Sequence, residues 1–303
     1  MATSRPSSID AIRWLFAPAT AETPRAQAIG ATALRILVGL MWLYNVSWKR
    51  APDFGEEAGN GLFKFTSYAV SDPVVPPFSW MVEHLVLPNF ALFGWGVLAA
   101  ETALAVLLLT GAWVRLAAAV GLAQSVAIAM SVAFAPHEWP WSYWLMIGAH
   151  GLLLVSTAGR VLAVDAVRSG GPARMLGQVW GVIAVIVGLV SVVWSLDDPM
   201  AGRGPGLKST DLSISLGEYN LVGGLVLAVA GALLLVSVRG GPRRMAQLAA
   251  GLAVLAGLSL HAQLGFTDPV LGGSTTSAAF FFAVALVAAC VGAAPRHSQD
   301  ARA

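Results

Sequence analysis

The stretch LAAETALAVLLLTGAWVR, residues 98–115, is apolar except for a carboxylate at Glu101 and a cation at Arg115. Its length and composition are typical of a membrane-spanning helix, because about 20 residues at 1.5 Å per residue cross a hydrocarbon core about 30 Å thick. An ionised side chain at the centre of a bilayer costs about 3 kcal/mol on insertion scales, so such a group usually has a partner or a task. Glu101 therefore predicts a polar site inside the fold.

The rest of the chain is similarly apolar. Of its 303 residues, 57% are hydrophobic and only 11% are charged, whereas roughly 25% of the residues of a soluble domain are charged. Apolar segments of membrane-spanning length predict an all-α, polytopic membrane helix bundle with about eight transmembrane helices. The eight segments are roughly 28–48, 90–110, 116–135, 142–158, 176–195, 218–238, 246–266 and 276–294.

The arginines predict the orientation of this bundle. With both termini inside, the segments assigned to the cytoplasm contain twelve arginines, whereas the outer loops contain only Lys49, Arg50, Lys64, Arg203 and Lys208. The positive-inside rule then predicts that both termini are cytoplasmic and that the protein is a multi-pass protein of a bacterial plasma (inner) membrane. Residues 1–27 have no continuous apolar region before a cleavage site, so we interpret them as a cytoplasmic lead-in, and 295–303 as a cytoplasmic tail.

The longest outer connection, 49–89, contains a short apolar stretch between prolines. Residues 77–87 are too few to span a bilayer, which predicts an interfacial or re-entrant helix. Tryptophans gather near the same side, either as an interfacial aromatic belt or as the mouth of a ligand site. They are Trp42, Trp48, Trp80, Trp95, Trp139, Trp141, Trp144 and Trp194.

The second half contains a short internal repeat. GGPARM at 170–175 returns as GGPRRM at 240–245, and the pair Asp198-Pro199 returns at the same spacing as Asp268-Pro269. This pattern predicts two similar hairpins, so that 170–294 forms a second four-helix module. The helices of this half contain few mid-membrane polar groups, which indicates packing rather than a second active site.

Four polar residues of the first four predicted helices lie at similar depths from the cytoplasmic ends. At 1.5 Å per residue, Arg35, Glu101, Gln124 and His150 lie roughly 10, 15, 14 and 14 Å deep. Polar groups in lipid need partners within the protein, so we expect these side chains to face the interior of a four-helix bundle. Two interpretations remain open: an Arg35–Glu101 ion pair that fixes helix register, or a proton-handling or headgroup-binding site with Glu101, His150 and Arg35 as the catalytic residues.

Other kinds of chemistry find little support in the sequence. The net charge of +2 gives no basis for nucleic-acid binding, and Cys290 is the single cysteine. The sequence contains no P-loop, nucleophile elbow, Rossmann fingerprint or HExxH motif, so no nucleotide or metal site is indicated. The pairs Glu83-His84 and His137-Glu138 are interpreted as loop residues. His261 lies near the outer end of its helix, away from His150, so haem is not indicated either.

Three stretches resemble the DoxX/DoxD family of membrane proteins, which includes the small subunit of thiosulfate:quinone oxidoreductase. They are RILVGLMWLYNVSWK at 35–49, ETALAVLLLTGAWVRLAA at 101–118 and WSYWLMIGAHGLLLVSTAGRVLAVD at 141–165. The resemblance covers about residues 28–165. The matching positions are Arg35, Lys49, Glu101, Gly111, Arg115, Gly159, Arg160 and Asp165.

This resemblance implies that 28–165 is a four-helix membrane module that serves a redox enzyme, often beside a separate catalytic subunit. It also implies a quinone as the lipid-soluble partner, for which Gln124, Trp42 and Lys49 are the candidate binding residues. The second half, 170–294, is an addition that a minimal member of the family does not contain.

The leading hypothesis is therefore an accessory or quinone-interacting subunit of a membrane oxidoreductase, with a non-catalytic and a quinone-binding role both left open. Two alternatives stay open. The first is a transporter of a small solute or of protons, since buried Glu and His also mark proton relays. The second is a non-catalytic anchor or scaffold for a redox complex that uses a surface of small residues. These are Gly223, Gly224, Ala228, Gly231 and Ala232.

Overall fold

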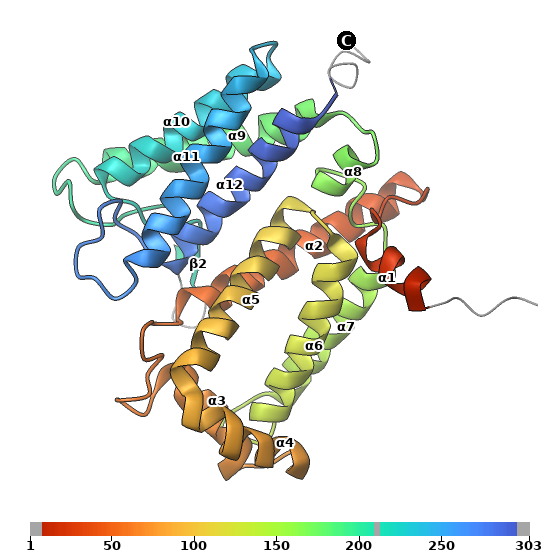
Figure 1. Cartoon of the computed structure of the whole chain (residues 1–303), viewed down its shortest axis with the longest axis vertical. Helices are drawn as coiled ribbons and strands as arrows, with labels where there is room; N and C mark the ends of the chain where they lie inside the picture. Colours follow the sequence, from red (N-terminus) through yellow and green to blue (C-terminus); the bar gives the residue numbers. More distant parts are fainter. Residues whose placement is uncertain (1–7, 209–212, 296–303) are drawn as a thin grey trace, which may run out of the picture.

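A computed structural model describes residues 8–208 and 213–295, and they form a bundle of helices with a single small hairpin of strands (Figure 1). The elements of the first half are α1 (Ser8–Phe16), α2 (Arg25–Ser47), α3 (Gly61–Ser71), α4 (Pro76–Met81), a π-turn η1 (Val82–Val86), a 3₁₀ turn η2 (Leu87–Asn89), α5 (Phe90–Thr110), α6 (Val114–Val132), α7 (Pro140–Val155) and α8 (Val164–Arg168). The second half contains α9 (Ala173–Trp194), β1 (Gly206–Lys208), β2 (Ser213–Ser215), α10 (Leu221–Val238), α11 (Arg243–Ala262) and α12 (Thr275–Ala293).

Seven helical segments of the described chain are long and apolar enough to cross a membrane. They are α2, the run from α4 to the end of α5, α6, α9, α10, α11 and α12. These segments indicate an integral membrane protein. The remaining apolar segment, 142–158, falls in α7, which has 16 residues and is short for a bilayer core.

The outer connection is more helical than its composition suggests. The segment 77–87, predicted as an interfacial helix, is part of a continuous helical run from Pro76 to Thr110 that passes through η1 and η2 into α5. Helix α3 was not predicted from the sequence, and it buries Leu62, Thr66 and Ala69 at a spacing of one turn. Helix α3 packs against α4, η1 and α6, so helices rather than loops cover the bundle at its predicted outer side.

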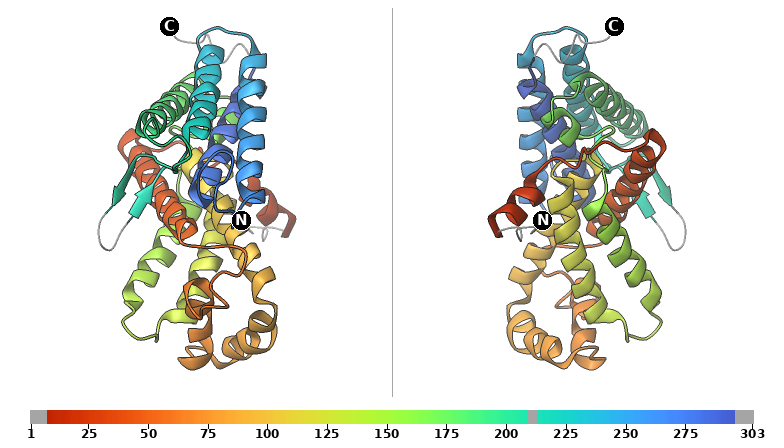
Figure 2. Two further views of the ribbon diagram at one scale, coloured as in Figure 1. Left: turned by 90° about the vertical axis from the view of Figure 1, so that its left-hand side faces the viewer. Right: turned by 90° about the vertical axis from the view of Figure 1, so that its right-hand side faces the viewer.

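Helix α12 holds the two halves together. In its most apolar window, 72% of the residues are buried inside the protein, the largest share of any spanning segment. It contacts α2, α5 and α8 of the first half and α9, α10 and α11 of the second. Figure 2 shows α9–α12 gathered at one end of the molecule, away from α3, α4 and the outer parts of α5–α7.

The repeated motifs adopt the same local structure. Gly170 and Gly240 have positive φ angles of 94° and 101°. The next residue in each copy, Gly171 or Gly241, donates its N–H to a carbonyl five residues earlier. This 6→1 bond is the signature of a Schellman turn, which favours glycine in the left-handed position. Pro172 and Pro242 then cap α9 and α11, so both motifs turn the chain into an outgoing helix.

Small residues of α10 are used inside the chain, where they let α9 approach closely. A Cβ on Gly188 would lie 2.6 Å from backbone atoms of both Gly224 and Ala228. A Cβ on Gly231 would lie 2.8 Å from the carbonyl oxygen of Gly181. Three of the small residues considered for a scaffold surface, Gly224, Ala228 and Gly231, therefore serve intramolecular packing.

We expect Gly188→Ala to destabilise the α9–α10 pair by roughly 1–3 kcal/mol, because the added methyl group meets backbone that cannot rotate away. Thermal unfolding of the detergent-solubilised protein measures this change. The control is Gly251→Ala in α11, where a Cβ meets nothing within 4 Å. Equal melting temperatures for the two variants would contradict the assignment of Gly188 to a close helix contact.

Candidate functional site

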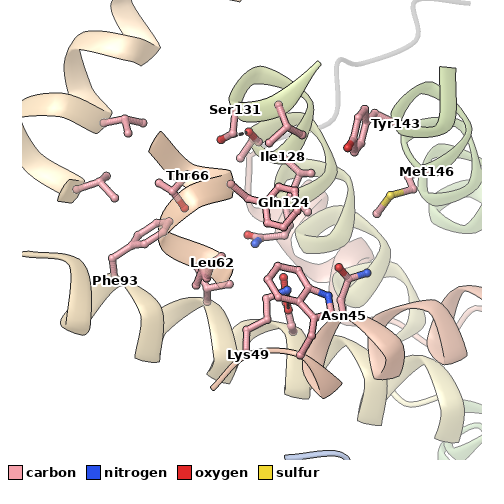
Figure 3. A pocket seen from close by; sticks show the side chains of 18 of the residues that line it. Asn45, Lys49, Leu62, Thr66, Phe93, Gln124, Ile128, Ser131, Tyr143 and Met146 are labelled. Atoms are coloured by element: carbon pink, nitrogen blue, oxygen red, sulfur yellow. Dashed lines mark hydrogen bonds and ion pairs between the residues drawn. The ribbon is translucent and has the colours of Figure 1, made fainter. Parts of the chain in front are cut away.

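A cavity of about 640 Å³ lies among α2, α3, α4, η1, α5, α6 and α7. Its lining comes from the C-terminal ends of α2 and α6 and the N-terminal parts of α5 and α7, which meet at the predicted outer side. Figure 3 shows Lys49 and Asn45 near its floor, Phe93 at one side, and Tyr143 and Met146 at the other. A volume of this size suits a small-molecule ligand, for which sites of about 300–1,000 Å³ are typical.

An ion pair forms the floor of this cavity. The Nζ atom of Lys49 lies 2.6 Å from Oε2 of Glu101, and the two side chains are only 2% and 1% exposed. Lys49 follows the end of α2, and its ammonium group also lies 3.7 Å from the centroid of the Trp48 ring, a cation–π geometry. Burial lowers the pKa of Lys49, and the adjacent Glu101 carboxylate opposes that shift. Glu101 thus has the partner that its position in an apolar helix requires.

The amide of Gln124 lies beside the Glu101 carboxylate, and both residues line the cavity. Gln124 is on α6, so the floor joins three parts of the chain: the end of α2, the middle of α5 and the middle of α6. Asn45, one turn before Lys49, also lines the cavity. A ligand at this depth meets a cation, a carboxylate and two amides, which together can donate and accept hydrogen bonds.

A second polar group lies nearer the outer side. The Tyr143 hydroxyl donates a short hydrogen bond to the Glu138 carboxylate, and both residues line the cavity. Glu138 belongs to the loop before α7, because α7 begins at Pro140. The sequence predicts Glu138 only as a loop residue, because its one distinguishing feature is its place beside His137 in an aromatic segment.

The walls of the cavity differ in character. The side formed by α4, η1 and the start of α5 presents only apolar side chains, namely Phe78, Met81, Val82, Val86, Phe93 and Val97. The opposite side, from α6 and α7, carries Gln124, Ser131 and Tyr143 among apolar neighbours (Figure 3). The cavity is therefore amphipathic, with polar groups at its floor and along one wall.

Arg35 lies elsewhere, and the expected Arg35–Glu101 ion pair is wrong. The Arg35 guanidinium is fully buried and donates to the carbonyl oxygens of Ala158, at 2.8 Å, and Leu162, at 2.9 Å. It also lies against Gly111, where a Cβ would collide with the guanidinium. These contacts are at the predicted cytoplasmic side, where the chain leaves α5 and α7, and they tie α2 to the loop before α8.

Asp165 completes this cytoplasmic cluster. Its carboxylate accepts hydrogen bonds from the backbone N–H groups of Trp113, at 3.0 Å, and Val114, at 3.1 Å, at the start of α6. It also pairs with Arg168 at 2.7 Å. A carboxylate at a helix N-terminus satisfies free N–H groups and favours the helix dipole. Arg35, Gly111 and Asp165, three of the positions that carry the DoxX/DoxD resemblance, thus meet in one structural cluster.

His150 forms a third polar group, which is separate from the cavity. Its Nε2 accepts a hydrogen bond of 2.9 Å from the indole Nε1 of Trp42, and its Nδ1 lies 2.8 Å from the carbonyl oxygen of Met146. The His150 ring packs directly over Gly121, where a Cβ would overlap it. Both His150 and Trp42 are fully buried. This arrangement is that of a hydrogen-bonded packing residue joining α2, α6 and α7.

The four side chains expected in one polar layer are therefore divided among three places. Glu101 and Gln124 meet at the cavity floor, Arg35 lies in the cytoplasmic cluster, and His150 pairs with Trp42. Of the candidate binding residues, Lys49 and Gln124 line the cavity, whereas Trp42 does not. Among the described residues, no group of three or more His, Cys, Asp or Glu side chains could hold a metal ion.

Searches against protein-family models, curated proteins and solved structures found no match for this chain. The resemblance of residues 28–165 to the DoxX/DoxD family accordingly stays a prediction from the motifs.

We expect Asp165→Asn to destabilise the protein by roughly 3 kcal/mol, because the substitution removes the charge that pairs with Arg168 and the second acceptor for the α6 N-terminus. Thermal unfolding in detergent measures the loss. The matched control is Asp268→Asn, an exposed position in the connection after α11. If the two variants have the same melting temperature, the cluster around Arg35 and Asp165 does not stabilise the fold.

The Lys49–Glu101 pair gives a separate prediction on stability. Lys49→Met and Glu101→Gln each leave one buried charge without its partner, and each should cost roughly 3 kcal/mol. The double variant removes both charges, so its loss should be clearly smaller than the sum of the single losses. Additive losses in a double-mutant cycle of thermal unfolding would show that the two side chains do not interact.

Proposed function

We propose that this chain binds a quinone in the cavity between α2, α3 and α5–α7, and acts as the quinone-interacting subunit of a membrane oxidoreductase. The observation that carries the proposal is the buried Lys49–Glu101 pair at the floor of an otherwise largely apolar cavity of about 640 Å³. Among the described Lys, Arg, Asp and Glu side chains, only Arg35, Lys49, Glu101 and Asp165 are buried, so a charged pair at the floor of an apolar cavity calls for a role.

The donors of the cavity suit the carbonyl and hydroxyl oxygens of a quinone head. The Lys49 ammonium and the Gln124 amide can donate to a carbonyl oxygen, and the Glu101 carboxylate can accept from a hydroxyl. The apolar wall of α4, η1 and α5 offers a surface for the ring and the start of an isoprenoid tail. A quinone supplies two-electron redox chemistry when bound, while these residues hold and orient its head.

The DoxX/DoxD resemblance supports the second half of the proposal. Members of that family serve redox enzymes, often beside a separate catalytic subunit, and the motif positions of this chain other than Lys49 and Glu101 lie towards the predicted cytoplasmic side. There, Arg160 donates to the carbonyl oxygen of Thr23 at 2.9 Å, and Arg168 donates to that of Phe16 at 3.2 Å. These bonds hold the lead-in before α2 against the bundle, so a partner subunit would meet an ordered surface.

A ligand site is better supported than a conduit for solutes. The residues that line the cavity come from the outer parts of the helices, down to the level of Glu101 and Gln124. Below Glu101, the side chains of Leu104, Ala105 and Leu108 on α5 are 0–1% exposed and belong to the packed core. A path through the first module would have to cross this packing, which supports binding over transport.

Equilibrium binding of radiolabelled decylubiquinone to the protein in lipid nanodiscs tests the proposal. Saturable binding is expected, and Glu101→Gln should weaken it about tenfold, which corresponds to one charge-assisted hydrogen bond of about 1.4 kcal/mol. Glu83→Gln is the matched control, because Glu83 is an exposed carboxylate on η1 that does not line the cavity.

Binding that is absent, or that Glu101→Gln and Glu83→Gln affect equally, would contradict the proposal. Circular dichroism and gel filtration of each variant show whether it is folded, so that lost binding is not mistaken for a lost fold.

A further inference from the structure

The polar residues on the α6 side of the cavity follow one another from its floor towards the outer side. Gln124 and Ser131 are seven residues apart on α6, which is two turns or about 10 Å along one helix face. Figure 3 shows Gln124, Ile128 and Ser131 in succession along this helix. The next polar residue along the chain that lines the cavity is Glu138, which accepts from the Tyr143 hydroxyl.

The helix face that carries these residues is distinct from the lipid-facing side of α6. Ala127 lies between Gln124 and Ser131 and lines the cavity with them. Val126 is 38% exposed on the outside of the protein and does not line the cavity. Polar side chains are thus found where α6 borders the cavity, while a neighbouring position that faces away is apolar.

An ion pair within a spanning bundle needs partners or a water-filled space. The ion pair is at the floor, and polar side chains continue from it along α6 towards the roofing helices. The lining includes five titratable residues, Tyr44, Lys49, Glu101, Glu138 and Tyr143. With Lys49 neutralised by Glu101, the remaining carboxylate, Glu138, gives the cavity a negative end. A negative group at an entrance raises the local concentration of cations and lowers that of anions.

We propose that the α6 wall of the cavity is an aqueous, cation-attracting entrance that connects the Lys49–Glu101 pair with the predicted outer side, with Glu138 as the group that sets its charge preference. The apolar wall of α4, η1 and α5 then remains for the ring and tail of a hydrophobic ligand. Water along the α6 wall is the route by which the buried pair exchanges protons with the outer solution. This inference rests on the proposed function only because both assign a role to the same cavity.

Cysteine accessibility in native membranes tests the entrance. In a Cys290→Ala background, Ser131→Cys and Ala127→Cys introduce thiols of nearly the native size on the cavity wall, and Val126→Cys is the control on the lipid-facing side. Membrane-impermeant methanethiosulfonates, one cationic and one anionic, are added from outside. Each rate is divided by the rate of the same reagent with a small free thiol in solution. On that scale, both wall cysteines should react at least tenfold faster than Val126→Cys, and the cationic reagent should react with them at least threefold faster than the anionic one.

The charge preference is tested by adding Glu138→Gln to Ser131→Cys, which should bring the ratio of cationic to anionic rates close to one. Asp268→Asn, a carboxylate removed in the other half of the chain, should leave the ratio unchanged. If the wall cysteines react no faster than Val126→Cys, the cavity is dry and the entrance is refuted. If Glu138→Gln leaves the ratio as it was, the role of Glu138 is refuted.

These outcomes are separate from those of the quinone experiment. Reactive wall cysteines without decylubiquinone binding would overturn the proposed function and keep the entrance. Binding of decylubiquinone to a protein whose wall cysteines are unreactive would overturn the entrance and keep the proposed function. Protection of Ser131→Cys by bound decylubiquinone would place both in the same cavity.

Discussion

The buried ion pair between Lys49 and Glu101 is the interaction on which the first half of the structure depends. A carboxylate in the middle of an apolar helix costs several kcal/mol unless a partner satisfies it. Lys49 supplies that partner from just beyond the end of α2, at 2.6 Å, and Gln124 of α6 lies beside the carboxylate. The pair thereby brings three segments to one point and leaves a cavity above it towards the predicted outer side.

The first half contains two polar clusters that differ in their surroundings: one bonds to the backbone, and the other lines the cavity. At the predicted cytoplasmic side, Arg35 and Asp165 bond mainly to backbone groups, and they fix how α2, α6 and the loop before α8 meet. On the other side, Lys49, Glu101 and Gln124 line the cavity. The positions of the DoxX/DoxD resemblance fall in both clusters, so the resemblance combines residues that hold the fold with residues that line the cavity.

Much of the helical architecture follows from the sequence, because apolar segments of about 20 residues have few alternatives in a membrane. The GGP motifs also predicted the equivalent turns before α9 and α11. Depth along a helix was a weaker guide to the site, since it does not tell which face a side chain occupies. Arg35 was therefore assigned to Glu101, whereas the true partner, Lys49, lies beyond the end of its helix. Helix α3 was missed because its amphipathic pattern is shorter than a membrane span.

Solid-state nuclear magnetic resonance on the protein in lipid bilayers tests the central claim most directly. With ¹⁵N-labelled lysine and arginine and ¹³C-labelled glutamate, the account predicts a strong dipolar contact between Lys49 Nζ and the Glu101 carboxyl carbon, and none between the Arg35 guanidinium and that carbon. A Glu101 carboxyl carbon coupled to Arg35, or to neither side chain, would contradict it.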